Sequence, residues 1–537
     1  MYCDKHQVNI LTSLTLAHGI RHAGVCPGSR NAVIIHNFHE ASLNLYPVTD
    51  ERSAAFVAIG LWLRFRTPIV VCVTSGSALL NLLPGVAEAA YRHIPLVIVS
   101  ADRPSCWIGQ NDGQTIPQHG ALKPYAHTWQ LPDTDFDSLT EEQAWYTNRL
   151  VNEVFCSCLQ HGGCPVHLNV PLSEPLFSFT TPELPSQRII RSWTLYEGSR
   201  LPQEVMKAVH GARNPWIVIG QYEDAPIPAV RTLQEKGWRV MAEHISNHSQ
   251  WADLRERDLP FAACSETPEA FSFPDLVLYF GGAFVGKQLK IWLRQCQAPI
   301  LRIDADNTLP DTFCHLTYKL CASPRTVLPL LVQMLDNEEG VTAVHSDALT
   351  THLPSNSLNN NPHKQPFEAL FLANSTAVRW SEAHIAPQSL APFTFCNRGT
   401  NGIEGSLSVA AGYSLAAEGK VLCLTGDLSF FYDANSLFNV RLDHRLRIMV
   451  VNNGGGGIFH RLPGIDCSPA LHDYISAGHP FSVSGIAASY QCTYISARTA
   501  CFAKDFDRLV TQIFEQPSER PVVLEVFPAD GDGGAIW

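Results

Sequence analysis

The chain has 537 residues, of which 45% are hydrophobic and 16% are charged, and its formal net charge is −12 at pH 7. Because domains average about 150 residues, this length exceeds one hydrophobic core and indicates several domains. The acidic balance makes the protein a poor candidate for wrapping nucleic acid or binding an anionic membrane.

The N-terminal residues and the cysteines indicate a cytoplasmic protein. The chain does not start with a basic segment followed by an apolar one, so no signal peptide is expected. It contains no apolar run of about 18 residues, so no membrane span is expected. Its 16 cysteines include no CxxC pair, which argues against a zinc site or a secreted disulfide framework.

Short apolar runs that resemble buried strands alternate with helix-like stretches along most of the chain. In chain order the runs are 68–76, 95–102, 215–220, 275–282, 299–306, 420–427 and 447–453. Apolar strands separated by helices are typical of parallel sheets covered on both faces. The sequence therefore predicts an α/β fold of doubly wound parallel sheets.

Two polar breaks divide the chain into three predicted domains. One break follows the proline-rich stretch 175–187, and the other is a linker at 336–366, rich in Ser, Asn and Pro. The predicted domains are 1–180, 190–335 and 367–537.

The first and third domains repeat one pattern of strand, Thr-containing turn, helix, strand and a final Asp or Asn. The spacing from Thr74 to Asp102 equals the spacing from Thr425 to Asn453. Open α/β sheets bind ligands at the carboxyl ends of their strands. The repeat therefore predicts a ligand held between the two outer domains.

Asp427 and Asn453 each follow a predicted strand of the third domain, and four glycines follow Asn453. Carboxylate, amide and carbonyl oxygens suit Mg²⁺, and glycines allow the backbone to approach a ligand closely. The alternative is an Asp that caps a helix and an Asn in a turn.

Gly426-Asp427 followed by Asn452-Asn453 resembles the diphosphate–metal signature of the thiamine diphosphate enzymes. That family has a pyrimidine-binding domain, a central domain and a diphosphate-binding domain, in this order. The resemblance implies thiamine diphosphate as cofactor and Mg²⁺ or Mn²⁺ held by Asp427, Asn453 and Gly455.

The family also uses a glutamate in the pyrimidine-binding domain. Glu51 begins an amphipathic helix, whereas Glu88 lies in the middle of a helix, so the resemblance assigns the role to Glu51. Bonded to N1′ of the aminopyrimidine, it would favour the imino tautomer that removes the thiazolium C2 proton. The alternative is a first-turn Glu favoured by the helix dipole.

The resemblance implies further cofactor contacts around these residues, with Ile403 as the large hydrophobic residue that bends the cofactor. The further contacts are Ser75, Asn81, Ile403, Gly426, Leu428, Ser429, Gly454, Ile458 and Phe459.

Stretches that contain arginine indicate which thiamine diphosphate enzyme the chain resembles. CPGSRN (26–31), SADRP (100–104), FLANSTAVRW (371–380) and CNRGTNGIEG (396–405) are similar to the 2-succinyl-5-enolpyruvyl-6-hydroxy-3-cyclohexene-1-carboxylate synthases of menaquinone biosynthesis. That family decarboxylates 2-oxoglutarate and adds the four-carbon carbanion to isochorismate. Both substrates are dicarboxylates, which the guanidinium fork of arginine suits.

This resemblance implies substrate-binding residues on loops and a homo-oligomer with sites at the dimer interface. The implied substrate contacts are Ser29, Arg30, Arg103, Gln114, Lys287, Ser375, Arg379, Arg398 and Leu462. Among them Ser375, Arg379 and Arg398 are expected to act beside Glu51 in catalysis. Asn31, Gly113 and Gln288 depart from the family pattern, which puts individual substrate contacts in doubt.

Three rival interpretations stay open. Gly281, Gly286 and Lys287 almost form a P-loop, but Gln288 stands where a hydroxyl residue is needed for Mg²⁺. An acetolactate synthase or another 2-oxoacid decarboxylase would share the cofactor but need fewer arginines for its monocarboxylate substrates. A non-catalytic α/β binding protein would not need Glu51 together with the metal-type residues.

Overall fold

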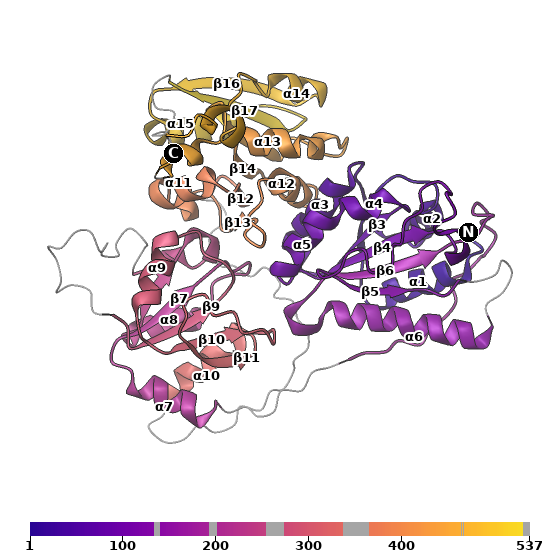
Figure 1. Ribbon diagram of the computed structural model, residues 1–537, viewed down its shortest axis with the longest axis horizontal. Helices are drawn as coiled ribbons and strands as arrows, with labels where there is room; N and C mark the ends of the chain where they lie inside the picture. The colour runs from indigo at the N-terminus through magenta and orange to yellow at the C-terminus, as the bar shows by residue number, and fades with distance from the viewer. Residues whose placement is uncertain are drawn as a thin grey trace. The chain divides into compact units, whose positions relative to one another are not determined.

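The computed structural model describes residues 1–133, 140–192, 201–253, 273–336, 365–462, 464–465 and 467–529. Its strands form three sheets, of six, five and six strands, and neighbouring strands run parallel (Figure 1). The predicted α/β class with three doubly wound parallel sheets is confirmed.

The first sheet has the strand order β2-β1-β3-β4-β6-β5. Its elements are α1 His6–Ala17, β1 His22–Val25, α2 Ala32–Glu40, β2 Asn44–Pro47, α3 Glu51–Phe65, β3 Ile69–Val73, α4 Ser77–Asn81, α5 Leu83–Tyr91, β4 Leu96–Asp102, β5 His127–Gln130, α6 Glu141–Cys158 and β6 Val166–Pro171. The strands β3, β4 and β6 are buried along their whole length, which explains their continuous apolar sequences.

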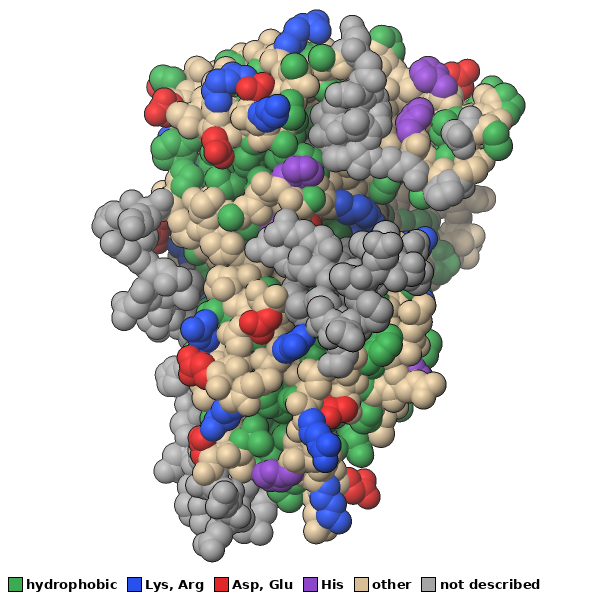
Figure 2. Space-filling view, turned by 90° about the vertical axis from the view of Figure 1, so that its left-hand side faces the viewer, with side chains coloured by type: hydrophobic (Ala, Val, Ile, Leu, Met, Phe, Trp, Pro, Cys, Tyr) green, Lys and Arg blue, Asp and Glu red, His purple; other side chains and the backbone are tan. Residues whose placement is uncertain are grey.

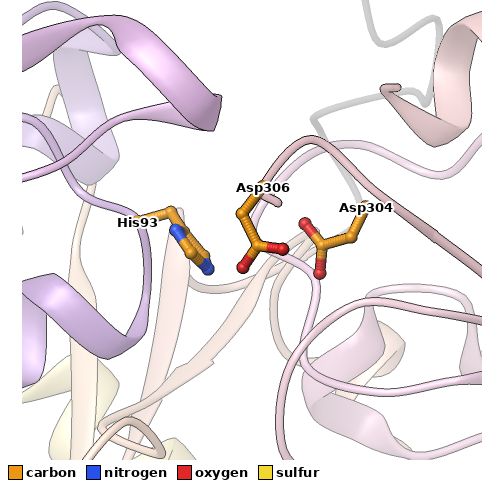
Figure 3. Close-up of side chains that lie close together, drawn as sticks. All are labelled: His93, Asp304 and Asp306. Atoms are coloured by element: carbon orange, nitrogen blue, oxygen red, sulfur yellow. The ribbon is translucent and has the colours of Figure 1, made fainter. Parts of the chain in front are cut away.

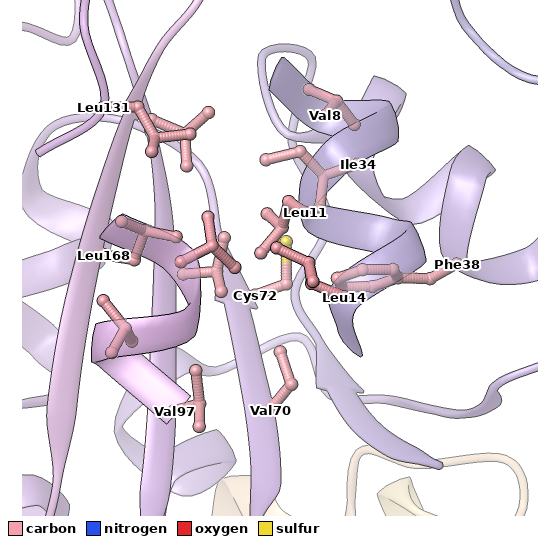
Figure 4. Packing of buried hydrophobic residues seen from close by; sticks show 14 of the residues in the cluster. Val8, Leu11, Leu14, Ile34, Phe38, Val70, Cys72, Val97, Leu131 and Leu168 are labelled. Atoms are coloured by element: carbon pink, nitrogen blue, oxygen red, sulfur yellow. The ribbon is translucent and has the colours of Figure 1, made fainter. Parts of the chain in front are cut away.

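The core of this sheet lies beneath α1, α2 and α6. Leu11 and Leu14 of α1 and Phe38 of α2 pack with Val70 and Val97 from the strands, and all five are buried (Figure 4). Burying each such side chain stabilises the fold by about 1.5–3 kcal/mol. The packed face fixes the register of the strands, whose carboxyl ends carry the predicted site residues.

The central sheet has the strand order β11-β10-β9-β7-β8. Its elements are α7 Gln203–Gly211, β7 Pro215–Ile219, α8 Pro228–Glu235, β8 Arg239–Ala242, β9 Leu276–Phe280, α9 Lys287–Gln295, β10 Ile300–Asp304, β11 Leu316–Cys321 and α10 Pro324–Asp336. Apolar side chains of α7, α8 and α10 pack on one face, and those of α9 on the other. This two-sided cover accounts for strands that are apolar on both faces.

The third sheet has the strand order β13-β12-β14-β15-β17-β16. Its elements are β12 Ala369–Leu372, α11 Thr376–His384, β13 Thr394–Cys396, α12 Ser406–Ser414, β14 Val421–Gly426, α13 Asp427–Asp433, β15 Leu446–Val451, α14 Ser484–Ser489, β16 Thr493–Thr499, α15 Phe502–Glu515 and β17 Val522–Pro528. β14 and β15 are adjacent, so the residues that follow them lie at one edge of the sheet.

The first and third sheets have the same topology. When the strands of each sheet are ranked by their place in the chain, both sheets have the order 2-1-3-4-6-5. The sequence repeat between the two outer blocks therefore reflects a shared fold.

Contacts divide the chain into two compact units. Unit 1 comprises Met1–Trp193, Phe371–Ala377 and Gly399–Trp537, and unit 2 comprises Thr194–Leu370 and Val378–Arg398. The first block and most of the third thus lie in one unit. The predicted domain boundaries stay a prediction, and most of the predicted linker lies outside the described residues.

Helices α3 and α12 of unit 1 approach each other through glycines. A Cβ on Gly60 would lie 2.1 Å from the carbonyl oxygen of Val409, and a Cβ on Gly412 would lie 2.1 Å from that of Val57. Both distances are far below contact distance and involve backbone atoms. The close packing of this helix pair therefore requires glycine at both positions.

Neither the visible face in Figure 2 nor the described helices indicate a membrane or nucleic-acid surface. Figure 2 shows Lys and Arg side chains interspersed with Asp and Glu on that face. Within the described ranges, none of the helices combines the length and apolarity needed to cross a bilayer.

Candidate active site

Asp427 lies at the end of β14, as the first residue of α13, and is almost fully buried. Its Oδ1 accepts a hydrogen bond from the backbone N–H of Leu428 at 2.7 Å. Its Oδ2 accepts from the N–H groups of Gly454 and Gly455, at 2.8 and 3.0 Å. The turn after β14 is thereby joined to the turn after β15, as the spacing of Asp427 and Asn453 predicted.

Burial raises the pKa of Asp427, and the surrounding hydrogen bonds and His479 act in the opposite direction. A buried carboxylate of this kind gains most from a cation that compensates its lost hydration. The site therefore suits a bound metal ion.

The glycine turn after β15 has a backbone that L side chains rarely adopt. Gly454 has φ +76° and Gly455 has φ +148°. A Cβ on Gly455 would also lie 2.9 Å from the carbonyl oxygen of Ser476. Asn453, at the start of this turn, is partly exposed, and Asn452 instead donates to the buried carboxylate of Glu525. The two asparagines thus differ in role, and only Asn453 is open to a ligand.

His479 is a neighbour of Asp427 that sequence reasoning missed. Its Nε2 lies 3.4 Å from Asp427 Oδ2, and its side chain is only 8% exposed. A single histidine in a loop carries no spacing signal, so nothing in the sequence distinguished it from the other 21 histidines of the 22 in the chain.

Glu51 is the first residue of α3, and the Asp50 side chain caps this helix by accepting the N–H of Arg52. Asn81, an exposed residue, donates to Glu51 Oε2 at 3.3 Å. Two sequence-predicted cofactor residues are therefore in contact. The prediction that Glu51 begins a helix is confirmed.

The start of α3 also contacts the end of α13. Arg52 donates to the carbonyl oxygen of Tyr432 at 2.7 Å and lies over its ring, and Asn435 donates to Asp50 at 2.9 Å. Tyr432 and Asp427 lie near opposite ends of α13. The Glu51 helix is thus joined to the Asp427 helix within one chain.

The turns after β1 and β3 bring further predicted residues together. A Cβ on Gly28 would meet the side chain of Thr74 at 2.3 Å, so the turn carrying Ser29 packs beside Ser75. A Cβ on Gly76 would lie 3.2 Å from the backbone of Gln114. Ser29, Ser75 and Gln114 thus gather at the carboxyl ends of adjacent strands, where α/β sheets bind ligands.

Ser75 offers a buried donor at this edge. Its hydroxyl is buried and has no hydrogen-bond partner among the described residues. The hydroxyl of Thr74 is also buried and has no hydrogen-bond partner among the described residues. Buried polar groups are normally satisfied, so unpaired hydroxyls at a strand end fit a site that takes a polar ligand.

Arg30 and Arg103 are both tied to the protein in unit 1. Arg30 is buried and donates to the Leu172 carbonyl oxygen at 2.7 Å and to Glu174 at 2.9 Å. Arg103 pairs with Asp112 at 2.9 Å. These contacts hold both guanidinium groups in place, and their substrate roles stay predictions.

The loop 399–405, which carries the exposed Ile403, is held by Glu88. This fully buried carboxylate accepts from the N–H groups of Gly399 and Thr400, at 3.0 and 2.7 Å, and from the Thr400 hydroxyl at 2.8 Å. Asn374 also donates to the Gly402 carbonyl oxygen at 2.7 Å. Sequence reasoning set Glu88 aside as a mid-helix residue and missed this anchoring contact, because the partner is more than 300 positions away.

Unit 2 carries the other basic residues of the prediction. Arg398 is buried and donates to the Phe284 carbonyl oxygen at 3.0 Å. Burial lowers the pKa of Lys290, the charge of Arg398 adds to this effect, and the charge of Glu243 opposes it. Lys290 of α9 therefore lies near both Arg398 and the buried carboxylate of Glu243. Lys290 was missed because it lies outside every quoted motif.

The P-loop interpretation is wrong. Gly286 precedes α9, and Lys287 is its exposed first residue. The N–H groups of Val285 and Gly286 donate to the buried carboxylate of Glu243, at 2.7 and 2.6 Å. The protein's own carboxylate thus occupies the place where a P-loop would bind phosphate.

Two further carboxylates lie close together near the end of β10 (Figure 3). Asp304 is the last residue of the strand, and Asp306 follows it. Each has a basic partner in unit 2: Arg302 pairs with Asp304, and Lys319 lies 3.0 Å from Asp306. These ion pairs account for both carboxylates. His93, also drawn in Figure 3, belongs to unit 1, so we assign no site to this group.

For the remaining predicted residues the structure gives the place in the fold, and their roles stay predictions. Ser375 has a left-handed backbone, with φ +68°, directly before α11. Leu462 is exposed, Ile458 and Phe459 are partly exposed, and Ser429 is buried in α13. Gly426 and Leu428 flank Asp427 and are partly exposed.

Comparison with known proteins identifies the family. Residues 8–122 match the model of the N-terminal TPP binding domain of thiamine pyrophosphate enzymes, and residues 376–526 match that of the C-terminal TPP binding domain. A 2-succinyl-5-enolpyruvyl-6-hydroxy-3-cyclohexene-1-carboxylate synthase of Bacteroides thetaiotaomicron is 38% identical over 98% of this chain and 96% of its own. The chain belongs to this synthase family.

Two further members of the synthase family are similar over nearly the whole chain. The synthase of Porphyromonas gingivalis is 34% identical over 98% of this chain and 95% of its own. The synthase of Desulfotalea psychrophila is 34% identical over 97% of this chain and 98% of its own. The chain is therefore a thiamine diphosphate-dependent transferase, as the resemblance predicted.

Proposed function

We propose that the enzyme decarboxylates 2-oxoglutarate and adds the resulting four-carbon unit to isochorismate, as expected of a menaquinone-pathway synthase. The observation that carries the proposal is the joined pair of turns at the ends of β14 and β15. There the buried Asp427 accepts hydrogen bonds from Gly454 and Gly455 in the glycine turn that follows Asn453. Membership of the synthase family supports the choice of substrates.

Asp427, Asn453 and the carbonyl oxygen of Gly455 would hold Mg²⁺ or Mn²⁺ together with the cofactor diphosphate. Three hard oxygens from two adjacent strand ends match the ligands that Mg²⁺ takes from proteins, with phosphate oxygens completing the set. The buried carboxylate and the unusual backbone of Gly454 and Gly455 fit this use.

Glu51 would bind the aminopyrimidine ring and hold a proton at its N1′. The bound cofactor supplies the electron sink that decarboxylation needs. Asn81, which donates to Glu51, keeps the carboxylate oriented. Ser75, with its buried unpaired hydroxyl, offers a further polar contact for the ring.

Basic side chains would bind the carboxylates of the two substrates. The family resemblance implies Arg30, Arg103, Arg379 and Arg398 for this role, together with Lys287. Two dicarboxylates need several guanidinium groups, because each group forms paired hydrogen bonds with one carboxylate. A monocarboxylate substrate such as pyruvate would leave most of them unused.

The active enzyme would be a homodimer or a dimer of dimers with sites shared between subunits, as the family resemblance implies. In this arrangement α3 also touches α13 of its own chain, while Glu51 serves the metal site of the other subunit. A two-fold axis would then generate two equivalent sites.

One assay tests the function directly. The full-length protein is incubated with thiamine diphosphate, Mg²⁺, 2-oxoglutarate and isochorismate, and the adduct is sought by mass spectrometry. We expect the adduct with the wild type and its loss with Asp427→Ala. Product from pyruvate alone, with none from 2-oxoglutarate and isochorismate, would instead support an acetolactate synthase or another decarboxylase.

A further inference from the structure

His479 is held rigidly beside the candidate metal site. Its backbone N–H donates to the carbonyl oxygen of Gly454 at 2.9 Å. Its ring stacks on Phe481, with centroids 5.8 Å apart, and meets the edge of Phe431 at 5.3 Å. A ring held between two aromatic neighbours has little freedom to turn, so the direction of its nitrogens is determined by the fold.

The proton on the neutral ring can be placed from its contacts. The backbone N–H of Phe481 donates to Nδ1 of His479 at 3.2 Å. A ring nitrogen that accepts a hydrogen bond carries no proton, so the proton of the neutral ring is on Nε2. This Nε2 is buried and has no hydrogen-bond partner among the described residues. A buried donor without a partner thus lies 3.4 Å from Asp427 Oδ2.

The two oxygens of Asp427 have different surroundings. Oδ2 accepts the N–H groups of Gly454 and Gly455, and Nε2 of His479 lies 3.4 Å from it. Oδ1 accepts only the N–H of Leu428 among the described residues. Oδ1 is therefore the less crowded oxygen and the one more open to a cation.

We propose that His479 is a positioning residue that donates its Nε2–H to Asp427 Oδ2 and so directs Oδ1 toward the divalent cation. The proposal rests on the function proposed above, in which Asp427 is a metal ligand. Hydrogen-bonded neighbours that orient a ligating group typically change metal affinity by about 10–100-fold when removed. His479 touches neither substrate nor reacting atoms in this role.

A merely structural role for His479 would have a different signature. The ring fills space between Phe431 and Phe481, and losing it would destabilise the fold without regard to the donor. The test therefore needs two replacements of equal size, one with the N–H and one without.

His479→Gln and His479→Met provide this pair, because glutamine keeps an N–H near the place of Nε2 and methionine has the same length without a donor. Calorimetric titration of the full-length protein with Mg²⁺ at saturating thiamine diphosphate gives the affinity. The paramagnetic resonance signal of bound Mn²⁺ gives a second readout that is independent of activity. We expect about a tenfold or larger loss of affinity for His479→Met and less than about a threefold loss for His479→Gln.

Equal affinities for the two variants would overturn the proposal, whether both match the wild type or both fall. If His479→Met fails to fold, as judged by circular dichroism without metal, His479→Phe takes its place, because it keeps the stacked ring and lacks the donor. Asp427→Asn distinguishes failure of the metal site from failure of the role of His479. Normal metal-dependent cofactor binding in Asp427→Asn would refute the proposed metal site. If Asp427→Asn loses this binding while His479→Met keeps it, only the role of His479 is refuted.

Discussion

The Asp433 carboxylate accepts two hydrogen bonds from one residue, Ser408: one from its backbone N–H at 2.7 Å and one from its hydroxyl at 2.6 Å. Asp433 ends α13 and Ser408 lies in the first turn of α12, so these bonds join the two helices. Burial raises the pKa of Asp433 to about 6, and the bonds from Ser408 only partly oppose it.

Asp433 should make the folded state less stable as the pH rises from about 4 to 6. Its pKa lies above the reference value of 3.8, so in this interval the unfolded chain has released a proton that the folded chain still binds. The cost grows to at most about 3 kcal/mol and is constant above pH 6. Urea unfolding of the wild type and Asp433→Asn at pH 4 and pH 7 measures it: the wild type should lose stability relative to the variant. Parallel behaviour of the two proteins would contradict the assigned pKa.

Glu51→Gln should reduce turnover by about 10²-fold or more while the fold stays intact, because an amide cannot share a proton with N1′ as a carboxylic acid does. Steady-state kinetics and circular dichroism measure the two effects. The contact from Asn81 can form with glutamine as well, so positioning is largely kept. A variant that retained more than about a tenth of the wild-type rate would remove Glu51 from this role.

Gly412→Ala should destabilise the protein strongly, because its Cβ would collide with the Val57 carbonyl oxygen across the α3–α12 contact. Overpacking of this kind typically costs about 1–3 kcal/mol. Gly485→Ala is a matched control: it lies in α14, and its Cβ would meet nothing within 4 Å. Because alanine favours helices, the control should be neutral or slightly stabilising. Thermal unfolding of the two variants side by side checks the difference, and equal shifts would contradict the close approach.

Glu88→Gln should loosen the loop 399–405. The glutamine side chain has only one acceptor oxygen, so its NH₂ group would face one of the backbone N–H groups that now donate to the Glu88 carboxylate. The expected result is faster hydrogen exchange at the amides of Gly399 and Thr400, measured by mass spectrometry. Glu142→Gln, an exposed change in α6, is the control. Unchanged protection in Glu88→Gln would show that the loop is held by other contacts.

Mixing inactive subunits tests whether the site is shared. Glu51→Gln and Asp427→Ala subunits are each expected to be inactive. In a heterodimer with shared sites, one site carries both changes and the other carries neither. Unbiased co-expression should therefore restore about a quarter of wild-type sites, by counting over a two-fold interface. Purified heterodimers without activity would place Glu51 and Asp427 of one chain in one site.

The strands and the metal-type residues could be predicted from the sequence because their signals are local. Continuous apolar runs gave β3, β4, β14 and β15, and the position of Asp427 directly after one of them fixed its place at the sheet edge. The contacts of Glu88, Glu243 and His479 could not be predicted. Each of these side chains acts on backbone or carboxylate groups far away in sequence, and burial decides such contacts only once the whole fold is formed.

The shared strand order of the first and third sheets also makes their turns comparable position by position. Two sheets that follow one path through six strands place the turns after corresponding strands at corresponding edges. After the third strand, one sheet has Thr74-Ser75-Gly76 and the other has Thr425-Gly426-Asp427, so only one of these turns carries the carboxylate. Exchanging these two turns should therefore preserve both sheets and move the carboxylate from one to the other.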